Sequence, residues 1–365
     1  MFIEKINSLY SEVPTDLGNI LKNQEMVYLV DGMKDGMLNK NNFDPFVAMK
    51  AKLFTALEVK SIRNLDLPNA ATFLSGGAAQ FNGADSVYTI DTISHRDRIS
   101  LSLPIVEAGK LARNIGFNKR VTMDGTSCSS GNKSLFDIKM MMDLGYIDSA
   151  ILWSADDAVN TAMIGVFDIM KATVTKEKEA AGFLPSAFDS KNHGFYMGQA
   201  MSYMILTKEK TKNSIAEILG VSMQWEDYSN PLGQSPGGEG YESVIRDLFG
   251  QTGLKSQDID FIKSHGSGTV SNNQSEGTAI RKMFGKSFKA NSYKQYIGHT
   301  LGVNVGVEMD MVISDATKGI MRKIKNRTEA DENFLSEDYH AHPEIILSLS
   351  AGVGNNFGGN IIRML

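Results

Sequence analysis

The order of strand-like and helical patterns between residues 71 and 155 most constrains what this chain can fold into. Short apolar runs at residues 71–75, 121–123 and 149–155 have the length and composition of buried strands, and a glycine turn follows the first of them. Residues 98–115 instead carry apolar side chains at helical spacing. A strand–helix–strand order joins parallel strands through crossover helices. We therefore predict an α/β fold around a parallel sheet.

A second regularity is a faint internal duplication. Residues 194–206 and 352–365 each form a glycine-rich turn that leads into an apolar strand, and residues 216–223 open a second series of strands and helices between them. A charged, polar run before this second series is typical of a solvated linker. The pattern predicts two similar halves, residues 1–212 and 213–365.

Composition sets bounds on the kind of protein. The chain has 365 residues, of which 42% are hydrophobic and 22% charged, so it can bury a large core as an ordinary globular protein. A net charge of -5 favours neither nucleic acid nor an anionic surface as a partner. No apolar stretch is long enough for a membrane helix, and the N-terminus lacks the pattern of an export signal. A single cysteine excludes an intramolecular disulfide and fits a reducing compartment, so we expect a cytoplasmic protein.

That single cysteine, Cys128, lies in the run Asp-Gly-Thr-Ser-Cys-Ser-Ser-Gly at residues 124–131, directly before a helical pattern. A thiol at a helix entry meets the positive end of the helix dipole, which favours the thiolate. Small neighbouring residues let a substrate carbonyl approach the sulfur. We predict a nucleophile that carries an acyl group, with an inert buried cysteine as the alternative.

Two histidines lie in settings that suit the same site. His265 and His299 each follow a strand-like run and are surrounded by glycine, serine and threonine. Such loop positions point a side chain toward a cavity more often than an apolar helix face does. One histidine alone would indicate a structural role, but two of them together with the cysteine motif favour a catalytic site.

Five motifs in this order carry a family resemblance. The patterns T-A-C-S-S, G-F-x-x-G-E-G, H-G-T-G-T, K-S-x-x-G-H and G-F-G-G have counterparts at residues 126–130, 194–199, 265–269, 294–299 and 356–359. Over residues 90–365 the chain resembles the elongating β-ketoacyl synthases, which belong to the thiolase superfamily; the first ninety residues carry little of the pattern. The resemblance implies the thiolase fold, a five-layered α-β-α-β-α sandwich of two similar halves.

The resemblance also implies a reaction. An acyl group passes from an acyl carrier protein to Cys128, malonyl on a second carrier protein loses carbon dioxide, and the enolate attacks the acyl-cysteine in fatty-acid or polyketide synthesis. His265 and His299 would donate their Nε2–H groups to the malonyl thioester oxygen, where negative charge develops. Backbone N–H groups of Cys128 and Phe357 would form the oxyanion site. The substrates are carried on phosphopantetheine, so neither a bound cofactor nor a metal is expected.

The same resemblance assigns supporting roles. Lys294 would be a catalytic lysine paired with a carboxylate, and the position of Glu276 matches that carboxylate. Ser267 and Thr269 would hold the phosphopantetheine arm by hydrogen bonds.

Two phenylalanines, Phe195 and Phe357, match residues that gate or line the acyl pocket, and their flanking glycines permit close approach. The sequence departs from the family where Gln199 and Asn273 replace carboxylates. These changes are expected to alter the anchoring of a loop or the binding of a cation.

Members of the family act as dimers, so we expect a homodimer or a heterodimer with a related subunit, and an acyl carrier protein as partner. Carrier proteins are acidic, so docking of one would need a basic patch on this chain. The candidates for this patch are Lys50, Lys52, Lys60 and Arg63. A solvated helix face, with a helix expected at residues 46–57, would also explain these residues.

Several alternatives remain open. The chain resembles ketosynthase-like partner subunits of the chain-length-factor type, although these typically lose the nucleophile. An acyltransferase could use Cys128 without decarboxylation. Three other enzyme classes fit less well. A degradative thiolase would need a second cysteine, which the chain lacks, and an initiating synthase uses one histidine and one asparagine, whereas this chain has both histidines. Nothing in the sequence resembles the motifs of a cysteine hydrolase.

Overall fold

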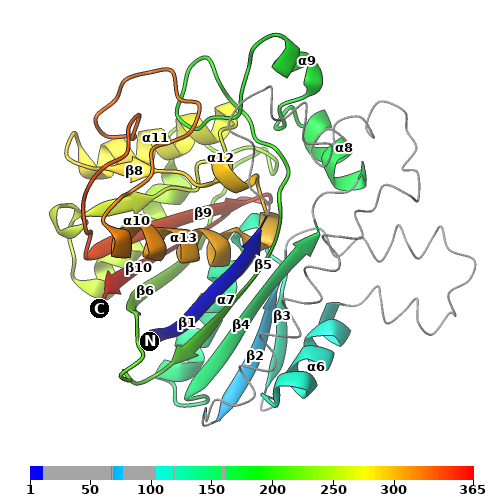
Figure 1. Ribbon diagram of the computed structural model, residues 1–365, viewed down its shortest axis with the longest axis vertical. Helices are drawn as coiled ribbons and strands as arrows, with labels where there is room; N and C mark the ends of the chain where they lie inside the picture. The colour runs from blue at the N-terminus through cyan, green and yellow to red at the C-terminus, as the bar shows by residue number, and fades with distance from the viewer. Residues whose placement is uncertain (11–66, 68, 77–103, 118–119, 158–160) are drawn as a thin grey trace, which may run out of the picture.

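The computed structural model describes residues 1–10, 67, 69–76, 104–117, 120–157 and 161–365 (Figure 1). The elements of the first half are β1 (Phe2–Tyr10), β2 (Ala70–Ser75), α6 (Pro104–Ile115), β3 (Val121–Asp124), η2 (Ser127–Ser129), α7 (Ser130–Asp143), β4 (Ser149–Asp157), α8 (Thr161–Ile169), α9 (Lys176–Ala180) and β5 (Gln199–Thr207). Those of the second half are β6 (Ala216–Trp225), α10 (Glu239–Thr252), η3 (Ser256–Asp258), β7 (Phe261–Lys263), α11 (Val270–Phe284), β8 (Ala290–Asn291), α12 (Lys294–Ile297), η4 (Leu301–Val303), α13 (Asn304–Lys318), β9 (Ile345–Gly352) and β10 (Asn356–Met364).

The predicted strands at residues 71–75, 121–123 and 149–155 are confirmed as β2, β3 and β4. Of the helix predicted at residues 98–115, the described part is α6, which begins at Pro104. Proline suits the first helical turn because its missing N–H has no partner there anyway. The candidate docking patch at Lys50, Lys52, Lys60 and Arg63 lies outside the described residues, as does the helix predicted at 46–57.

β1 was not predicted, because its sequence lacks a strand pattern. Along Phe2–Ser8 only Ile3 is buried, so apolar alternation is weak. The strand is held instead by its antiparallel pairing with β5, from Phe2 opposite Thr207 to Tyr10 opposite Ala200. Strand position here depends on pairing with a distant segment rather than on local propensity.

The strands form one sheet in the order β3-β2-β4-β5-β1-β6-β10-β9-β7-β8. The halves meet where β1 pairs with β6 through only Phe2–Glu217 and Ile3–Ala216. Outward from that junction, β1-β5-β4-β2-β3 and β6-β10-β9-β7-β8 follow the same rule: two antiparallel pairings and then two parallel ones. The same topology therefore occurs twice, and the boundary predicted at residues 212 and 213 falls in the connection between β5 and β6.

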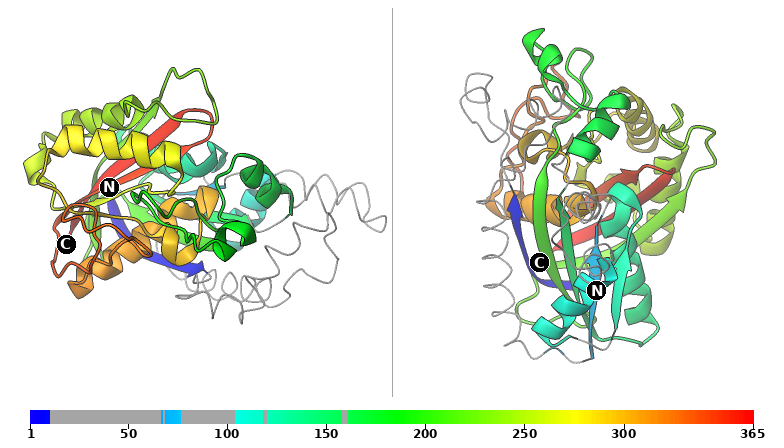
Figure 2. Two further views of the ribbon diagram at one scale, coloured as in Figure 1. Left: turned by 90° about the horizontal axis from the view of Figure 1, so that it is seen from above. Right: turned by 90° about the vertical axis from the view of Figure 1, so that its right-hand side faces the viewer.

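Helices cover and separate the two halves of the sheet (Figures 1 and 2). α7 and α13 lie between the halves and share one core cluster with residues of both. α6 covers the outer face of the first half, where Ala108 and Ile115 pack with Trp153 and Tyr203. α10 and α11 cover the outer face of the second half. The layers are thus α6, sheet, α7 with α13, sheet, and α10 with α11, which confirms the predicted five-layered thiolase-type sandwich.

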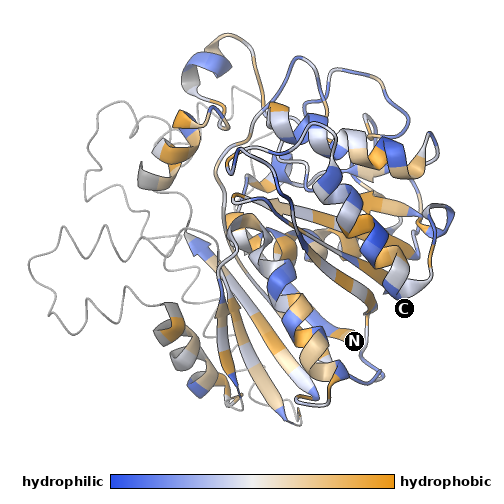
Figure 3. Cartoon of the chain, turned by 180° about the vertical axis from the view of Figure 1, so that it is seen from behind, coloured by the Kyte–Doolittle hydropathy of each residue, from blue (hydrophilic) through white to orange (hydrophobic). Residues whose placement is uncertain are grey.

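The strands inside this sandwich carry apolar bands, orange in Figure 3. Trp153 of β4 and Tyr203 of β5 stack with their ring centroids 5.6 Å apart, and both are buried. Burial of each such side chain stabilises the fold by about 2–3 kcal/mol. The rigid layers hold the ends of the central helices α7 and α13 in fixed positions. The loops at these ends carry the candidate site.

Candidate active site

Cys128 lies in a tight turn that leads from β3 into α7. Ser127 has a left-handed backbone with φ of 55°, a conformation that costs a non-glycine residue about 1–2 kcal/mol. Hydroxyl groups hold the turn: Ser129 Oγ donates to the Thr126 carbonyl at 2.7 Å, and Ser130 Oγ donates to the Ser127 carbonyl at 2.6 Å. The turn therefore presents the sulfur at the entry of the helix, as the sequence predicted.

The environment of Cys128 is buried, with only 3% of the residue exposed. Burial raises the pKa of the thiol to about 11, while the Ser127 hydroxyl, 3.7 Å from the sulfur, and the charge of Lys294 act in the opposite direction. The prediction that the helix entry favours the thiolate is wrong for the resting protein, because desolvation outweighs the favourable groups. Cys128 rests as a thiol and must lose its proton during the reaction.

The two predicted histidines lie together. The ring centroids of His265 and His299 are 5.6 Å apart, with the rings inclined by 76°, and both residues are almost completely buried. Burial, followed by the charge of Lys294, holds the pKa of each imidazole well below its usual range. Both rings are neutral near pH 7, so each can donate one N–H.

A strap formed by residues 194–198 joins the two histidine loops. Gly194 N–H donates to the Gly268 carbonyl at 2.6 Å, and His299 N–H donates to the Tyr196 carbonyl at 2.7 Å. Gly198 is needed for this contact, because a Cβ atom there would lie 2.4 Å from the carbonyl oxygen of Ile297. The strap fixes both loops relative to β5.

The cysteine and the histidines meet through the same strap. Phe195 belongs to an apolar cluster with Cys128 and Leu301, and its ring lies edge-on to His299 with centroids 4.8 Å apart. The turns η2 and η4, which follow β3 and His299, lie side by side. The structure therefore brings Cys128, Phe195, His265 and His299 from distant segments into one site.

Lys294 is buried next to this site, but the predicted pairing with Glu276 is wrong. Lys294 Nζ lies 2.7 Å from Glu308 Oε1 and donates to the His265 carbonyl at 2.6 Å. Glu276 instead accepts the N–H groups of His265 and Gly266, at 2.6 and 2.8 Å. Two converging backbone donors outcompete the lysine for this carboxylate, so Glu276 shapes the His265 turn.

Glu308 was missed by the sequence interpretation. It is completely buried in α13, between the apolar neighbours Val307 and Met309. A carboxylate inside an apolar helical stretch needs a buried cationic partner, and this signal could have identified it.

The predicted phosphopantetheine residues surround the start of α11. Thr269 caps this helix, accepting the Asn272 N–H at 3.3 Å, and its hydroxyl lies 3.2 Å from Ser267 Oγ. Asn272 Oδ1 in turn accepts the Ser267 N–H at 2.9 Å. These contacts explain the local fold, and the role of both hydroxyls toward phosphopantetheine stays a prediction.

The ring of Phe357 faces away from α7, the helix that follows Cys128. Neighbouring side chains of a strand point to opposite faces. In β10, Asn360 faces α7, where its amide donates to Asn132 at 2.7 Å. Phe357 lies on the other face and packs with Tyr241 of α10 at 4.9 Å between ring centroids. Its ring is part of the second-half core, and the prediction that it lines the acyl pocket is wrong; the oxyanion role of its N–H stays a prediction.

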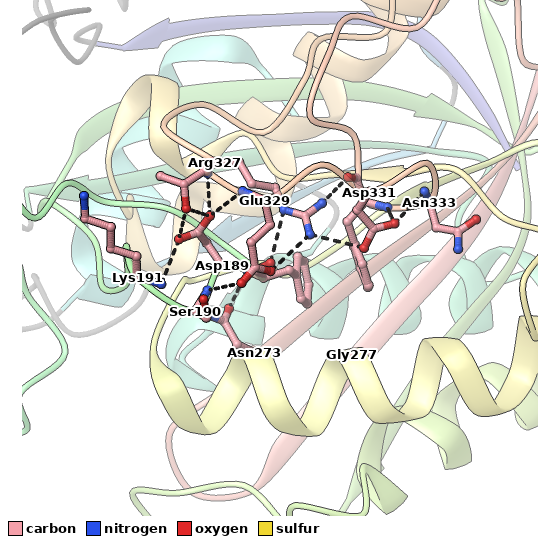
Figure 4. Close-up of polar contacts among 12 residues, drawn as sticks. Asp189, Ser190, Lys191, Asn273, Gly277, Arg327, Glu329, Asp331 and Asn333 are labelled. Carbon is pink, nitrogen blue, oxygen red and sulfur yellow. Dashed lines mark hydrogen bonds and ion pairs between the residues drawn. The ribbon is translucent and has the colours of Figure 1, made fainter.

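Asn273, which replaces a family carboxylate, anchors the loop before the strap. Its Oδ1 accepts the Phe188 N–H at 2.9 Å. Next to it, Asp189 accepts the Thr328 hydroxyl at 2.9 Å, and Arg327 pairs with Asp331 at 3.2 Å (Figure 4). An amide can therefore hold this loop without a charge at position 273. No group of three metal-ligating side chains occurs within the described ranges. Gln199, the other replacement, is the first residue of β5.

Comparisons with known proteins agree with this geometry. Residues 215–326 match the sequence model of the family described as "Beta-ketoacyl synthase, C-terminal domain". The chain is 22% identical to a protein of Schizosaccharomyces pombe assigned as a mitochondrial 3-oxoacyl-[acyl-carrier-protein] synthase, with 96% of this chain and 87% of that protein covered. It is 25% identical to an actinorhodin polyketide β-ketoacyl synthase of Streptomyces coelicolor, with 70% of this chain covered but only 56% of the relative.

Two solved structures share the fold. A ketosynthase of Xenorhabdus doucetiae in complex with its chain length factor matches with a TM-score of 0.72 at 19% identity, covering 100% of this chain and 98% of the matched chain. A structure of a type II polyketide ketosynthase in complex with its acyl-carrier protein matches with a TM-score of 0.74 at 18% identity, covering 82% of this chain and 79% of the matched chain. Residues 215–326 thus match the β-ketoacyl synthase C-terminal domain, and the chain as a whole is similar to β-ketoacyl synthases in sequence and shares their fold.

Proposed function

We propose that this protein is a β-ketoacyl-acyl carrier protein synthase, which joins an acyl group on Cys128 to malonyl on acyl carrier protein. The observation that carries the proposal is the meeting of a buried thiol with two neutral imidazoles, supplied by turns of both halves. A cysteine nucleophile accounts for acyl transfer, and the paired donors account for decarboxylation.

In the first step, the Cys128 sulfur attacks the thioester carbon of the acyl-carrier protein. The S–C bond to the carrier breaks, and the thiol proton of Cys128 ends on the departing phosphopantetheine sulfur. Because burial disfavours the free thiolate, proton loss must accompany attack rather than precede it. Phe195 and the apolar side chains around Cys128 suit an acyl chain at this point.

In the second step, malonyl bound through its thioester loses carbon dioxide, and the electron pair of the broken C–C bond moves onto the thioester oxygen. Imidazole N–H groups of His265 and His299 stabilise this charge, and each donor lowers the barrier by about 3–4 kcal/mol. The enolate carbon then attacks the acyl carbon, the C–S bond to Cys128 breaks, and the departing thiolate takes up one proton from solvent to restore the resting thiol. Lys294 holds the His265 loop through its carbonyl.

The partners of the proposed reaction are an acyl carrier protein and a second ketosynthase-like chain. Solved relatives include a ketosynthase in complex with its acyl-carrier protein and one in complex with a chain length factor, which supports both kinds of partner. In the part of the chain that the structure describes, no helix has the length and apolar character to cross a membrane. A cytoplasmic location stays a proposal.

The test is to incubate the purified chain with acyl-carrier proteins and measure its intact mass, and to measure carbon dioxide release from labelled malonyl-carrier protein. The wild-type chain should gain one acyl group and release carbon dioxide. Cys128→Ala should gain no mass and form no condensation product, while circular dichroism verifies its fold. Condensation that continues unchanged in Cys128→Ala would overturn the proposal.

The second candidate is a partner subunit of the chain-length-factor type. A solved structure that this chain matches with a TM-score of 0.72 holds a ketosynthase together with such a subunit. In this case a separate ketosynthase would carry the acyl group, and Cys128→Ala would leave the activity of the complex unchanged. Acyl loading of Cys128 without carbon dioxide release would indicate the remaining alternative, an acyltransferase.

A further inference from the structure

A second buried lysine shares the carboxylate of Glu308. Lys263, the last residue of β7, is 1% exposed, and its Nζ lies 2.6 Å from Glu308 Oε2 and donates to the Leu349 carbonyl at 2.9 Å. Lys294 takes the other oxygen of the same carboxylate at 2.7 Å. No role in the proposed reaction accounts for Lys263, and an isolated Lys294–Glu308 pair would be satisfied without it.

The three groups leave an excess of positive charge in a desolvated place. Burial lowers the pKa of Lys263, and the Glu308 carboxylate acts in the opposite direction. With both amines protonated, the group formed by Lys263, Lys294 and Glu308 carries one net positive charge. A buried charge that is not neutralised is costly and is retained only where the surroundings hold it. This excess lies directly beside the histidines, because Lys263 is two residues before His265 and Lys294 donates to the His265 carbonyl.

We propose that Lys263 is a positioning residue of the active site, which occupies one oxygen of Glu308 so that Lys294 is only partly neutralised and the positive field keeps both histidines uncharged. The proposal rests on the proposed function, since only there does the uncharged donor form of the imidazoles matter.

The other charged groups around the histidines do not supply the same field. Burial raises the pKa of Glu276 of α11, while the N–H groups of Gly266 and His265 that its carboxylate accepts act in the opposite direction. Asp156 of β4, the acidic group on the cysteine side, accepts the Gly302 N–H at 2.7 Å. Both carboxylates favour protonated imidazole, so the two lysines must outweigh them. Burial lowers the pKa of each histidine most, followed by the charge of Lys294. His299 and then Lys263 lower the pKa of His265 further, and Lys263 lowers that of His299.

The chemical benefit is twofold. A neutral imidazole donates its N–H to the thioester oxygen but is too weak an acid to protonate the enolate, which therefore survives to attack the acyl-cysteine. Decarboxylation moves the negative charge from the malonyl carboxylate onto the thioester oxygen, where the same excess positive charge stabilises it in a site from which water is largely excluded.

The test is nuclear magnetic resonance of the intact chain with labelled histidine, which reports the protonation of each imidazole without any substrate. The chain has six histidines, and His265→Gln and His299→Gln assign the two signals of the site. In the wild type both signals should keep the neutral form from pH 8 to pH 5. In Lys263→Met they should move toward the protonated form within this range, because Glu308 then neutralises Lys294 fully.

A charge-restoring variant separates electrostatics from packing. Lys263→Met combined with Glu308→Gln again leaves one net positive charge, that of Lys294, and should return both signals toward the neutral form. A purely structural role for Lys263 predicts that the double variant is no closer to wild type than the single one. Lys289→Met is the matched control, because Lys289 is a half-buried lysine next to β8 whose Nζ donates to the Glu332 carbonyl, and it should leave both signals unchanged.

Two results would overturn the proposal: signals in folded Lys263→Met that stay neutral as in the wild type, or a double variant that titrates like Lys263→Met. Thermal unfolding of each variant establishes that it is folded. Because this measurement uses no carrier protein, its outcome is independent of whether the chain releases carbon dioxide from malonyl, and the two proposals can fail separately.

Discussion

The same turn occurs once in each half of the molecule, and only the first copy carries a cysteine. In the first half, Thr126 and Ser127 lead through η2 into α7; in the second, Thr300 and Leu301 lead through η4 into α13. Ser127 and Leu301 both adopt the left-handed region, with φ of 55° and 48°. Cys128 and Gly302 are therefore equivalent positions of a duplicated turn.

The difference between the copies shows how one backbone supports two tasks. Serine hydroxyls close the Cys128 turn, whereas in the other copy the Gly302 N–H donates to Asp156 at 2.7 Å and the preceding loop carries His299. In the proposed reaction the first copy supplies the nucleophile and the second supplies hydrogen-bond donors. The two helices behind the turns approach closely, since a Cβ atom on Gly131 would lie 2.6 Å from Cβ of Val305.

Moving the thiol between the copies should have the largest effect. The double variant Cys128→Gly, Gly302→Cys keeps one thiol in an equivalent turn, yet we expect no acyl loading by intact mass. The N–H of residue 302 is occupied by Asp156, and the neighbouring carboxylate opposes a thiolate there. Gly302→Cys alone should still load at Cys128. Acyl adducts mapped to residue 302 of the double variant would show that the two turns are interchangeable.

Removing a donor from the second half should separate the two steps of the proposed reaction. His265→Ala and His299→Ala should each reduce carbon dioxide release by about 10²–10³-fold, the usual effect of losing one such donor. Acyl loading of Cys128 should continue in both variants, because the nucleophile lies in the other half. Equal losses of loading and decarboxylation would contradict this division of labour.

The buried thiol should make stability depend on pH in the alkaline range. Its pKa is raised from 9.0 to about 11 by burial, so between these values the unfolded chain loses the proton and the folded chain retains it. The free energy of unfolding should therefore fall by about 1.4 kcal/mol per pH unit as pH rises above 9. Urea unfolding of the wild type and of Cys128→Ala measures this fall. The contributions of the other titrating groups cancel when the two free energies of unfolding are subtracted. A difference that is constant from pH 8 to 11 would contradict it.

The smallest expected effect concerns strain in the first copy of the turn. Ser127→Gly should stabilise the protein by about 1 kcal/mol, because glycine adopts the left-handed region without a steric penalty. Ser129→Gly is the control: Ser129 has φ of -98°, so its replacement relieves no strain and removes a hydrogen bond to Thr126. Thermal unfolding compares the two, and equal destabilisation of both would argue against strain at Ser127.

Much of the architecture was accessible from local patterns. Apolar runs of strand length predicted β2, β3 and β4, and the glycine-rich turns before apolar strands predicted the repeat. β1 escaped because its short sequence is neither uniformly apolar nor clearly alternating; its place depends on β5, about two hundred residues away. Pairing partners at such a distance leave no local pattern.

The sequence by itself determined the kind of chemistry: a lone cysteine at a helix entry and two histidines in glycine-rich loops are recognisable because each depends on its immediate neighbours. Only the tertiary structure decided which carboxylate pairs with Lys294, that Lys263 shares it, and that Phe357 faces α10 rather than Cys128. It also decided that Cys128 rests as a thiol. The physical reason is that ion pairing, the facing of a strand and desolvation depend on what distant segments bring to a site.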